Sequence, residues 1–231
     1  MSEMRTQLVE TATALLSDGT ATVDAFSEAG FGLLLTSEAD GGFGGDWGDA
    51  VEVLRLVGFY QPRLDVAGLM VGDATHERAL ATTALIGGAL QRALELSIEH
   101  ANTRVQFGKP LGKQQAVQQA LALMAEEVAA VAVASQAAAK ARDSGDAAFE
   151  IGCAKLRANK AAGIGGAIAH QVHGAIGFTQ DYPLHHYTAK LIEWRSAYGH
   201  DAYWAGVVGE FALGFSGLEL WQEVTRRSDC L

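Results

Sequence analysis

The feature that most constrains the fold of this chain is the position of its prolines. Its 231 residues include three, Pro62, Pro110 and Pro183, and each lies between stretches whose apolar residues recur at helical spacing. Proline breaks a helix interior because it lacks the amide N–H and its ring clashes with the preceding turn, so the stretches between can be continuous helices. We predict an antiparallel four-helix bundle from residues 76–103, 114–142, 147–173 and 184–198.

Three shorter helices are predicted ahead of the bundle, over residues 3–17, 22–30 and 47–60. The glycine-rich turn DGGFGGDWGD separates the last two. No stretch longer than about five residues alternates apolar and polar side chains as a strand does, so we predict an all-α chain. Its two parts are an N-terminal helical part with a connector, residues 1–75, and a C-terminal four-helix bundle with a tail, residues 76–231.

The charge of the chain argues against one broad class of function. Its formal net charge is -10, whereas binding to nucleic acid normally needs a basic face, so no nucleic acid partner is expected. Two cysteines, Cys153 in a helical stretch and Cys230 near the last residue, form no framework of pairs, and we expect a reducing, cytoplasmic setting. No uninterrupted apolar run approaches about 18 residues, so no membrane partner is expected.

The segment RVQFGKP, residues 104–110, is a local exception to this acidic charge. It carries Arg104 and Lys109, with an aromatic residue and a glycine between them, where a predicted helix ends. Arg104 can bind an anion here. It can also stabilise the helix dipole, while F-G-K-P ends the helix without any ligand. Lys109 is expected to be a solvated surface charge.

Several motifs in a fixed order resemble the acyl-CoA dehydrogenase family. RVQFGKPLGKQQAVQ (104–118), a long alanine-rich helix and AKLRANKAAGIGGAIAHQVHGAIGFTQDYPLHHY (154–187) follow one another as in the C-terminal helical domain of that family. FSEAGFGLLLTSEADGGFGG (26–45) is similar to the family's N-terminal stretch with its P-E-x-x-G-G-x-G turn, where Ser37 replaces the proline. The resemblance covers residues 76–211 well and 22–60 weakly, and it implies FAD as the cofactor.

Full-length members of the family place a β-domain between these two helical parts. Here PRLDVAGLMVGDAT, residues 62–75, joins them, and a connector this short is not an independent sheet of three or more strands. The chain therefore resembles the shortened subunits of heteromeric acyl-CoA dehydrogenases, such as those that act on steroid side chains. This implies an α2β2 heterotetramer with a longer acyl-CoA dehydrogenase subunit, and an acyl-CoA substrate, with steroid acyl-CoA as a candidate.

The resemblance also implies a role for the cation at position 104. In the family the FAD crosses a subunit boundary, and the neighbouring subunit contacts its pyrophosphate through R-x-x-F-G with a following glutamine and through Q-x-x-G. The planar donors of arginine suit a pyrophosphate, and glycine lets the backbone approach a ligand closely. The cofactor-binding residues implied for this chain are Arg104, Phe107, Gln115, Gln171 and Gly174.

The glutamate base of the family has no clear equivalent, so no catalytic residue is assigned to this chain. Aligned from QVHGAIGFTQDYP, Tyr198 takes the place of that glutamate, and a phenol is a poor base at neutral pH. Glu77 beside Arg78 resembles a second position that other members use, but it is one residue out of register, which turns a helical side chain by about 100°. Acidic residues are also common in the first turn of a helix, where they stabilise the helix dipole and have no catalytic role.

The predicted function is that of a subunit of a flavin-dependent acyl-CoA dehydrogenase. It supplies the pyrophosphate side of the FAD site and is inactive alone, while the partner supplies the β-domain and the catalytic glutamate. Two alternatives stay open: a self-sufficient homo-oligomeric acyl-CoA dehydrogenase with Glu77 as base, and a helical scaffold subunit without flavin. No metal site is predicted, because neither Glu-x-x-His pairs nor zinc-type Cys/His spacing occur. His173, within QVHGAIG, is expected to pack behind the site.

Overall fold

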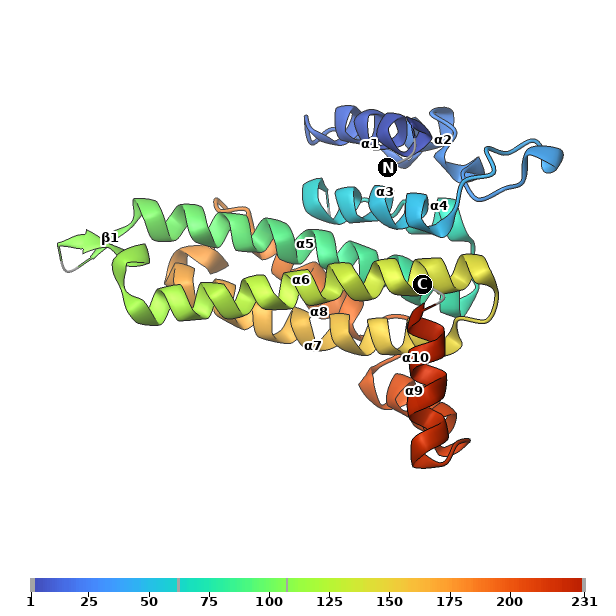
Figure 1. Cartoon of the computed structure of the whole chain (residues 1–231). Helices are drawn as coiled ribbons and strands as arrows, with labels where there is room; N and C mark the ends of the chain where they lie inside the picture. Colours follow the sequence, from blue (N-terminus) through green and yellow to red (C-terminus); the bar gives the residue numbers. More distant parts are fainter. Residues whose placement is uncertain (1–2, 62, 107, 230–231) are drawn as a thin grey trace.

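The computed structural model of the chain describes residues 3–61, 63–106 and 108–229. At its centre, long helices run alongside one another as the predicted four-helix bundle (Figure 1). The all-α prediction is confirmed, and the predicted bounds of the bundle helices agree with the observed ones within two residues. The bundle consists of α5 (Thr75–Thr103), α6 (Gln115–Ser144), α7 (Ala148–His173) and α8 (Leu184–Ser196).

Helix α5 is the centre of the packing, because it contacts α6, α7 and α8 within the bundle and α3 outside it. Large apolar side chains such as Leu80, Ile86 and Leu90 are fully buried along it. Burying one side chain of this size stabilises the fold by roughly 1.5–3 kcal/mol. Alanines and glycines between them let the neighbouring helices approach closely, which explains why so alanine-rich a sequence forms a dense core.

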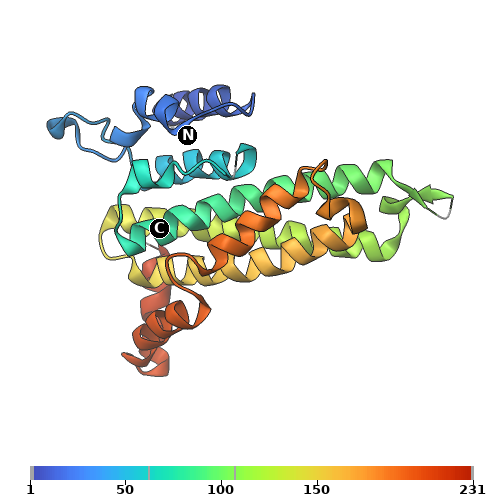
Figure 2. The ribbon, with the colours of Figure 1, turned by 180° about the vertical axis from the view of Figure 1, so that it is seen from behind.

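The N-terminal helices form a layer on one side of the bundle, with α1 outermost and α3 lying between α1 and α5 (Figures 1 and 2). Asp46 and Asp49 form a capping box at the start of α3, and Arg5 of α1 pairs with both carboxylates at 2.8 and 2.6 Å. One apolar core runs from α1 through α3 into the bundle. The elements of this layer are α1 (Glu3–Leu16), α2 (Val23–Glu28), α3 (Trp47–Tyr60) and α4 (Ala67–Val71).

The connector between the N-terminal layer and α5 contains only the short helix α4 and turns in its described residues. The described strands of the chain are β1 (Val105–Gln106) and β2 (Lys109–Pro110), which pair as an antiparallel hairpin after α5. Gly108 in the hairpin turn has φ +76, a left-handed conformation that favours glycine. This hairpin projects beyond the ends of α5 and α6 (Figure 1).

Two helices after the bundle, α9 (Asp201–Leu213) and α10 (Gly217–Asp229), lie in the region that the sequence analysis treats as a tail. Trp204 is fully buried and anchors α9, which packs on α7. Both helices extend away from the bundle axis (Figure 1). Large apolar side chains on these helices and in the turn between them remain exposed at Leu213, Phe215, Leu218 and Trp221, which is typical of a surface that another molecule covers.

Helix α6 is long and apolar enough to cross a membrane by length and composition, and among the described residues it is the one helix that meets this test. From the sequence, no membrane span was expected because the uninterrupted apolar run ends at Glu126 and Glu127. Averaged over a longer window, the many alanines raise the mean hydropathy of this helix. Only 22% of the most apolar window is buried. Helix α6 packs along α3, α5 and α7. A bundle helix whose outer face is apolar therefore accounts for the length and the apolar composition of α6.

Lys155 of α7 is fully buried in the bundle. Its Nζ donates to Asn159 Oδ1 at 2.6 Å and to the Trp194 carbonyl at 2.8 Å, and Asn159 in turn donates to Asp201 at 2.9 Å. Burial disfavours the charged amine, and the negative charge of Asp201 offsets this only in part, so the pKa of Lys155 falls to about 8. The network therefore ties α7 to the end of α8 and the start of α9 at an electrostatic cost.

This lowered pKa predicts a change of stability with pH. Between about pH 8 and about pH 10.5 the unfolded chain keeps a proton on Lys155 that the folded chain has lost, so stability rises with pH in this window. Relative to Lys155→Met, the wild type should gain up to about 3 kcal/mol across it. Urea unfolding at several pH values measures this, with Lys160→Met, an exposed lysine of α7, as control. A constant difference between wild type and Lys155→Met would contradict the prediction.

Candidate functional site at the end of the bundle

A cavity of about 480 Å³ lies where α5 ends, α6 begins and α7 ends. The hairpin closes one side, and η4 (Gly174–Phe178), a 3-10 helix after α7, closes another. The cavity thus combines two segments that are more than 50 residues apart in the sequence. Its lining residues are His100, Arg104, Gln106, Leu111, Val117, Gln171, Val172, His173, Gly174, Ala175 and Ile176.

Arg104 occupies the C-cap of α5, and its backbone N–H donates to the His100 carbonyl at 2.8 Å. Its own carbonyl accepts from Leu111 N–H at 2.9 Å, which holds the base of the hairpin. The side chain is exposed and forms no hydrogen bond or ion pair within the part of the chain that the structure describes. All donors of its guanidinium are therefore available to a ligand in the cavity.

Two imidazoles form the inner wall of the cavity. His173 is buried and stacks on His100 with ring centroids 4.6 Å apart. Its Nδ1–H donates to the Ala169 carbonyl at 2.8 Å, so Nε2 accepts from the Tyr182 hydroxyl at 3.1 Å. Burial lowers the pKa of both His173 and His100, and the nearby His173 and Arg104 charges lower that of His100 further. Both rings are therefore neutral at pH 7, and Arg104 is the cation that lines the cavity.

The end of α7 supplies a polar side chain and an open backbone. Gln171 is exposed at the cavity, and Gly174 forms the C-cap with φ +62, a conformation that residues with a side chain rarely adopt. A Cβ added at Gly174 would meet no atom within 4 Å, so the space in front of this backbone is open. A ligand can approach the chain closely here.

The structure brings three of the predicted cofactor-binding residues to one cavity: Arg104, Gln171 and Gly174. Gln115 is the first residue of α6 and exposed, but it does not line the cavity. Phe107 lies outside the described residues. The sequence analysis did not predict His100, whose only signal is its place one helical turn before Arg104.

The two positions considered for a base lie elsewhere. Glu77 is in the first turn of α5 and accepts hydrogen bonds from Arg142 Nε at 3.1 Å and Nη2 at 2.9 Å. Burial raises the pKa of Glu77, but hydrogen bonds from its backbone and from Arg142 lower it below the ordinary value overall. Tyr198 lies after α8, with its ring over the guanidinium of Arg78. Neither residue lines the cavity at the end of the bundle.

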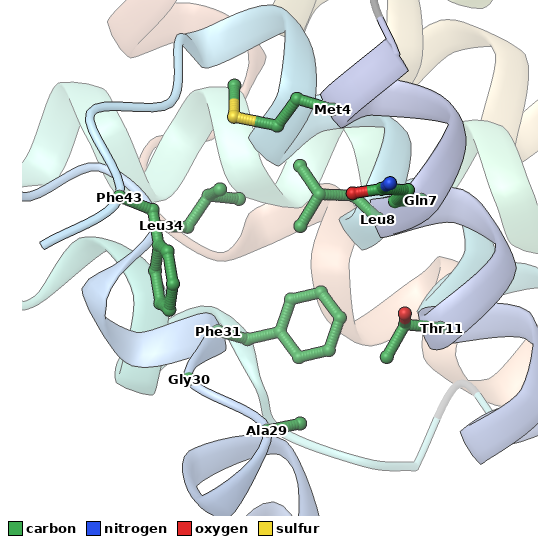
Figure 3. A pocket seen from close by; sticks show the side chains of 9 residues that line it. All are labelled: Met4, Gln7, Leu8, Thr11, Ala29, Gly30, Phe31, Leu34 and Phe43. Atoms are coloured by element: carbon green, nitrogen blue, oxygen red, sulfur yellow. The ribbon is translucent and has the colours of Figure 1, made fainter.

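A smaller cavity of about 210 Å³ lies in the N-terminal layer (Figure 3). The side chains of Met4, Leu8, Phe31, Leu34 and Phe43 surround it. Its polar side chains, Gln7 and Thr11, carry no charge, so it offers nothing to balance an anion. The cavity beside Arg104 is therefore the stronger candidate for a charged cofactor.

The sequence model described as "Acyl-CoA dehydrogenase, C-terminal domain" matches residues 68–201, which is more than half of the chain. The chain belongs to the acyl-CoA dehydrogenase family. The match includes the bundle helices and both segments that line the cavity. Among curated acyl-CoA dehydrogenase relatives, the glutaryl-CoA dehydrogenase of Desulfococcus multivorans is 34% identical over 122 residues, which is 52% of this chain and 31% of that protein. The chain thus spans about a third of that relative.

Two solved structures match nearly the whole length of this acyl-CoA dehydrogenase family member. A chain of the ChsE4–ChsE5 complex from Mycobacterium tuberculosis has a TM-score of 0.81 and 15% identity, with 94% of this chain and 99% of that chain covered. A chain of the Tcur3481–Tcur3483 steroid ACAD has a TM-score of 0.80 and 17% identity, with 92% and 98% covered. At this identity they establish a shared fold, and no β-domain separates the two helical parts in the described residues of this chain. The predicted resemblance to shortened acyl-CoA dehydrogenase subunits is therefore confirmed at the level of the fold.

Proposed function

We propose that this chain is a subunit of a flavin-dependent acyl-CoA dehydrogenase and forms the pyrophosphate side of the FAD site. A longer partner subunit supplies the β-domain and the catalytic glutamate. When bound, FAD accepts the hydride during α,β-desaturation of an acyl-CoA thioester. The residues of this chain bind and orient the cofactor and carry out no proton transfer.

The observation that carries this proposal is the meeting of Arg104 with Gln171 and Gly174 in one cavity. A guanidinium without a protein partner offers several N–H donors in one plane, which suits the two phosphates of a dinucleotide. The amide of Gln171 and the open backbone at Gly174 add polar contacts beside it. The residues present therefore fit the pyrophosphate of FAD, while neutral His100 and His173 leave the charge balance to Arg104.

The need for a partner is supported by exposed apolar side chains that the isolated chain leaves uncovered. Val133 on α6, Ile192 on α8 and Trp221 on α10 are each about 70% exposed. The hairpin that follows Arg104 projects from the bundle, where a second chain can reach it (Figure 1). One of the solved structures with this fold is a complex of two proteins. We therefore propose an α2β2 heterotetramer, located in the cytoplasm, in which the partner covers part of this surface.

The alternative with Glu77 as base is supported less well. The two hydrogen bonds from Arg142 hold this carboxylate and lower its pKa, and both effects make it a weaker base. A scaffold subunit without flavin would leave the cluster of Arg104, Gln171 and Gly174 without a use. Because a steroid ACAD shares the fold, a steroid acyl-CoA is the substrate that we propose to test first.

Co-expression with a longer acyl-CoA dehydrogenase that carries the β-domain tests the proposal. The chain purified alone should be colourless and inactive, whereas the complex should contain FAD, seen by its visible absorbance, and should desaturate acyl-CoA. Size-exclusion chromatography with light scattering measures the assembly. A yellow, active homo-oligomer would favour the self-sufficient enzyme. A colourless complex, or a monodisperse monomer that ignores every co-expressed relative, would contradict the proposed function.

A further inference from the structure

A second polar cavity, of about 130 Å³, lies at the other end of α5. It is formed by the connector after α3, the first turns of α5 and the end of α8. Arg78 and Arg104 are 26 positions apart on one helix, which separates them by roughly 39 Å. The two cavities are therefore independent sites. The charged and aromatic residues that line the second one are Arg63, Asp65, Arg78, Lys190, Glu193, Trp194 and Tyr198.

Arg78 is the buried charge of this second cavity, with only 8% of its surface exposed. Its Nε and Nη1 are buried and have no hydrogen-bond acceptor among the described residues. The nearest carboxylate oxygen, on Asp65, is 3.9 Å from Nη1, which is beyond hydrogen-bond distance, and the Asp65 side chain is 73% exposed. The guanidinium has therefore lost its water at these atoms without gaining an acceptor.

A buried guanidinium with unpaired donors destabilises the folded chain unless a ligand supplies hydrogen-bond acceptors. Leaving a buried donor unpaired destabilises the folded chain, and more strongly when the group is charged. The ring centroid of Tyr198 lies 4.8 Å from the Arg78 guanidinium carbon, and this cation–π contact offsets part of the cost but accepts no conventional hydrogen bond. Asp65, exposed to water, adds little. The balance favours an acceptor oxygen with negative charge beside Arg78.

The other cations of the cavity already have partners. Lys190 pairs with Glu193 at 2.9 Å, and Arg63 contacts the ring of His186. The lining carries three cations, Arg63, Arg78 and Lys190, and two carboxylates, Asp65 and Glu193, so its net charge is +1. This charge balances a singly charged anion and not a phosphate dianion. The small volume of the cavity also excludes a bulky ligand.

The backbone at Tyr198 is strained in a way that supports this arrangement. Its φ of 54 is the one positive value among the non-glycine residues that the structure describes. The turn is held because Trp204 Nε1 donates to the Tyr198 carbonyl at 3.0 Å. Strain of this kind is destabilising and is found often at ligand sites. Here it places an aromatic ring on one side of the guanidinium of Arg78.

We propose that this cavity binds a carboxylate through Arg78, with the Tyr198 ring packed on the guanidinium. The carboxylate comes either from a small free acid or from a side chain of the partner subunit. Both sources offer the same chemistry, a single negative charge on two acceptor oxygens. The site is separate from the FAD contact. Its binding of a free carboxylate stands if the proposed function fails, and only the partner's carboxylate rests on that function.

Thermal unfolding of the full chain in acetate tests the site, with chloride and phosphate at matched ionic strength as references. Acetate in excess of its Kd should raise the Tm of the wild type by several degrees. Arg78→Met should abolish this increase, and it should itself unfold at a higher temperature without acetate, because a buried unpaired charge is removed. Arg92→Met is the matched control, since Arg92 lies on α5, pairs with Glu95 and does not line the cavity.

The assembled complex distinguishes the two sources. An acetate response that persists in the complex assigns a free carboxylate. A response that disappears there, together with at least tenfold weaker assembly of Arg78→Met, assigns a carboxylate of the partner. Four outcomes would overturn the proposal. The first two are an equal response to chloride and a response to acetate that is retained in Arg78→Met. The others are a larger Arg78-dependent response to phosphate, and no response in either the chain or the complex together with normal assembly of Arg78→Met.

Discussion

Arg104→Ala is expected to weaken FAD binding by the assembled complex about a hundredfold, without loss of folding. Arginine makes paired, charge-assisted hydrogen bonds to phosphate, and a loss of about 2.8 kcal/mol corresponds to this factor. The folded chain should not suffer, because the Arg104 side chain makes no hydrogen bond or ion pair in the described structure. Flavin content after dialysis and the Tm of the complex measure the two effects separately.

Two further variants make the Arg104 experiment specific. Arg104→Lys keeps the charge but loses the planar fork, so it should recover only part of the affinity. Lys109→Ala removes a positive charge from the same hairpin, at an exposed position outside the cavity, and should change affinity less than about twofold. Equal losses in Lys109→Ala and Arg104→Ala would indicate a general charge effect. Unchanged flavin content in Arg104→Ala would mean that Arg104 acts only as the C-cap of α5.

Gly88→Ala is expected to destabilise the chain by about 3 kcal/mol or more. The added Cβ would lie 1.9 Å from the Arg55 carbonyl oxygen and 2.7 Å from the Phe59 nitrogen, both backbone atoms of α3. Backbone cannot rotate away as a side chain can, so α3 and α5 must separate along their apolar contact. The alanine also gains up to about 1 kcal/mol of helix propensity, which is too little to compensate. For a chain of this size the Tm should fall by roughly 6–12 °C.

Gly166→Ala is the matched control for Gly88→Ala. Gly166 lies in α7, and a Cβ there would meet no atom within 4 Å. This variant should therefore gain stability, by about 0.5–1 kcal/mol, from helix propensity alone. Urea unfolding of both variants gives the comparison. If Gly88→Ala unfolds within about 1 °C of the wild type, the close approach of α3 and α5 does not govern their docking.

The long helices were predictable from the sequence because their signals are local. Pro110 and Pro183 lie outside the helices they separate, and Gly145 and Gly174 cap α6 and α7. Such signals depend on residues within one or two turns of each other. The tail helices α9 and α10 were missed. Apolar residues occur on all sides of α9, so no stripe marks it, whereas α10 is amphipathic and was predictable from its sequence.

The candidate site was predictable only in part. The resemblance to the family's motifs indicated Arg104, Gln171 and Gly174, and the structure brings these to one cavity. Gln115 does not line this cavity, because the residue that the first turn of α6 contributes to it is Val117. His100 could be found only after folding, because its partner His173 is more than 70 residues away in the sequence.

By itself the sequence determined that the chain is helical, where its bundle helices lie and which family it resembles. These properties follow from proline and glycine positions, apolar periodicity and short motifs, all of which act over neighbouring residues. Only the tertiary structure decided that Gly88 meets the backbone at Arg55. It also decided that Tyr198 covers Arg78, whose buried Nε and Nη1 have no hydrogen-bond acceptor among the described residues. Such contacts depend on how separate helices pack, and helix packing is set by the whole core at once.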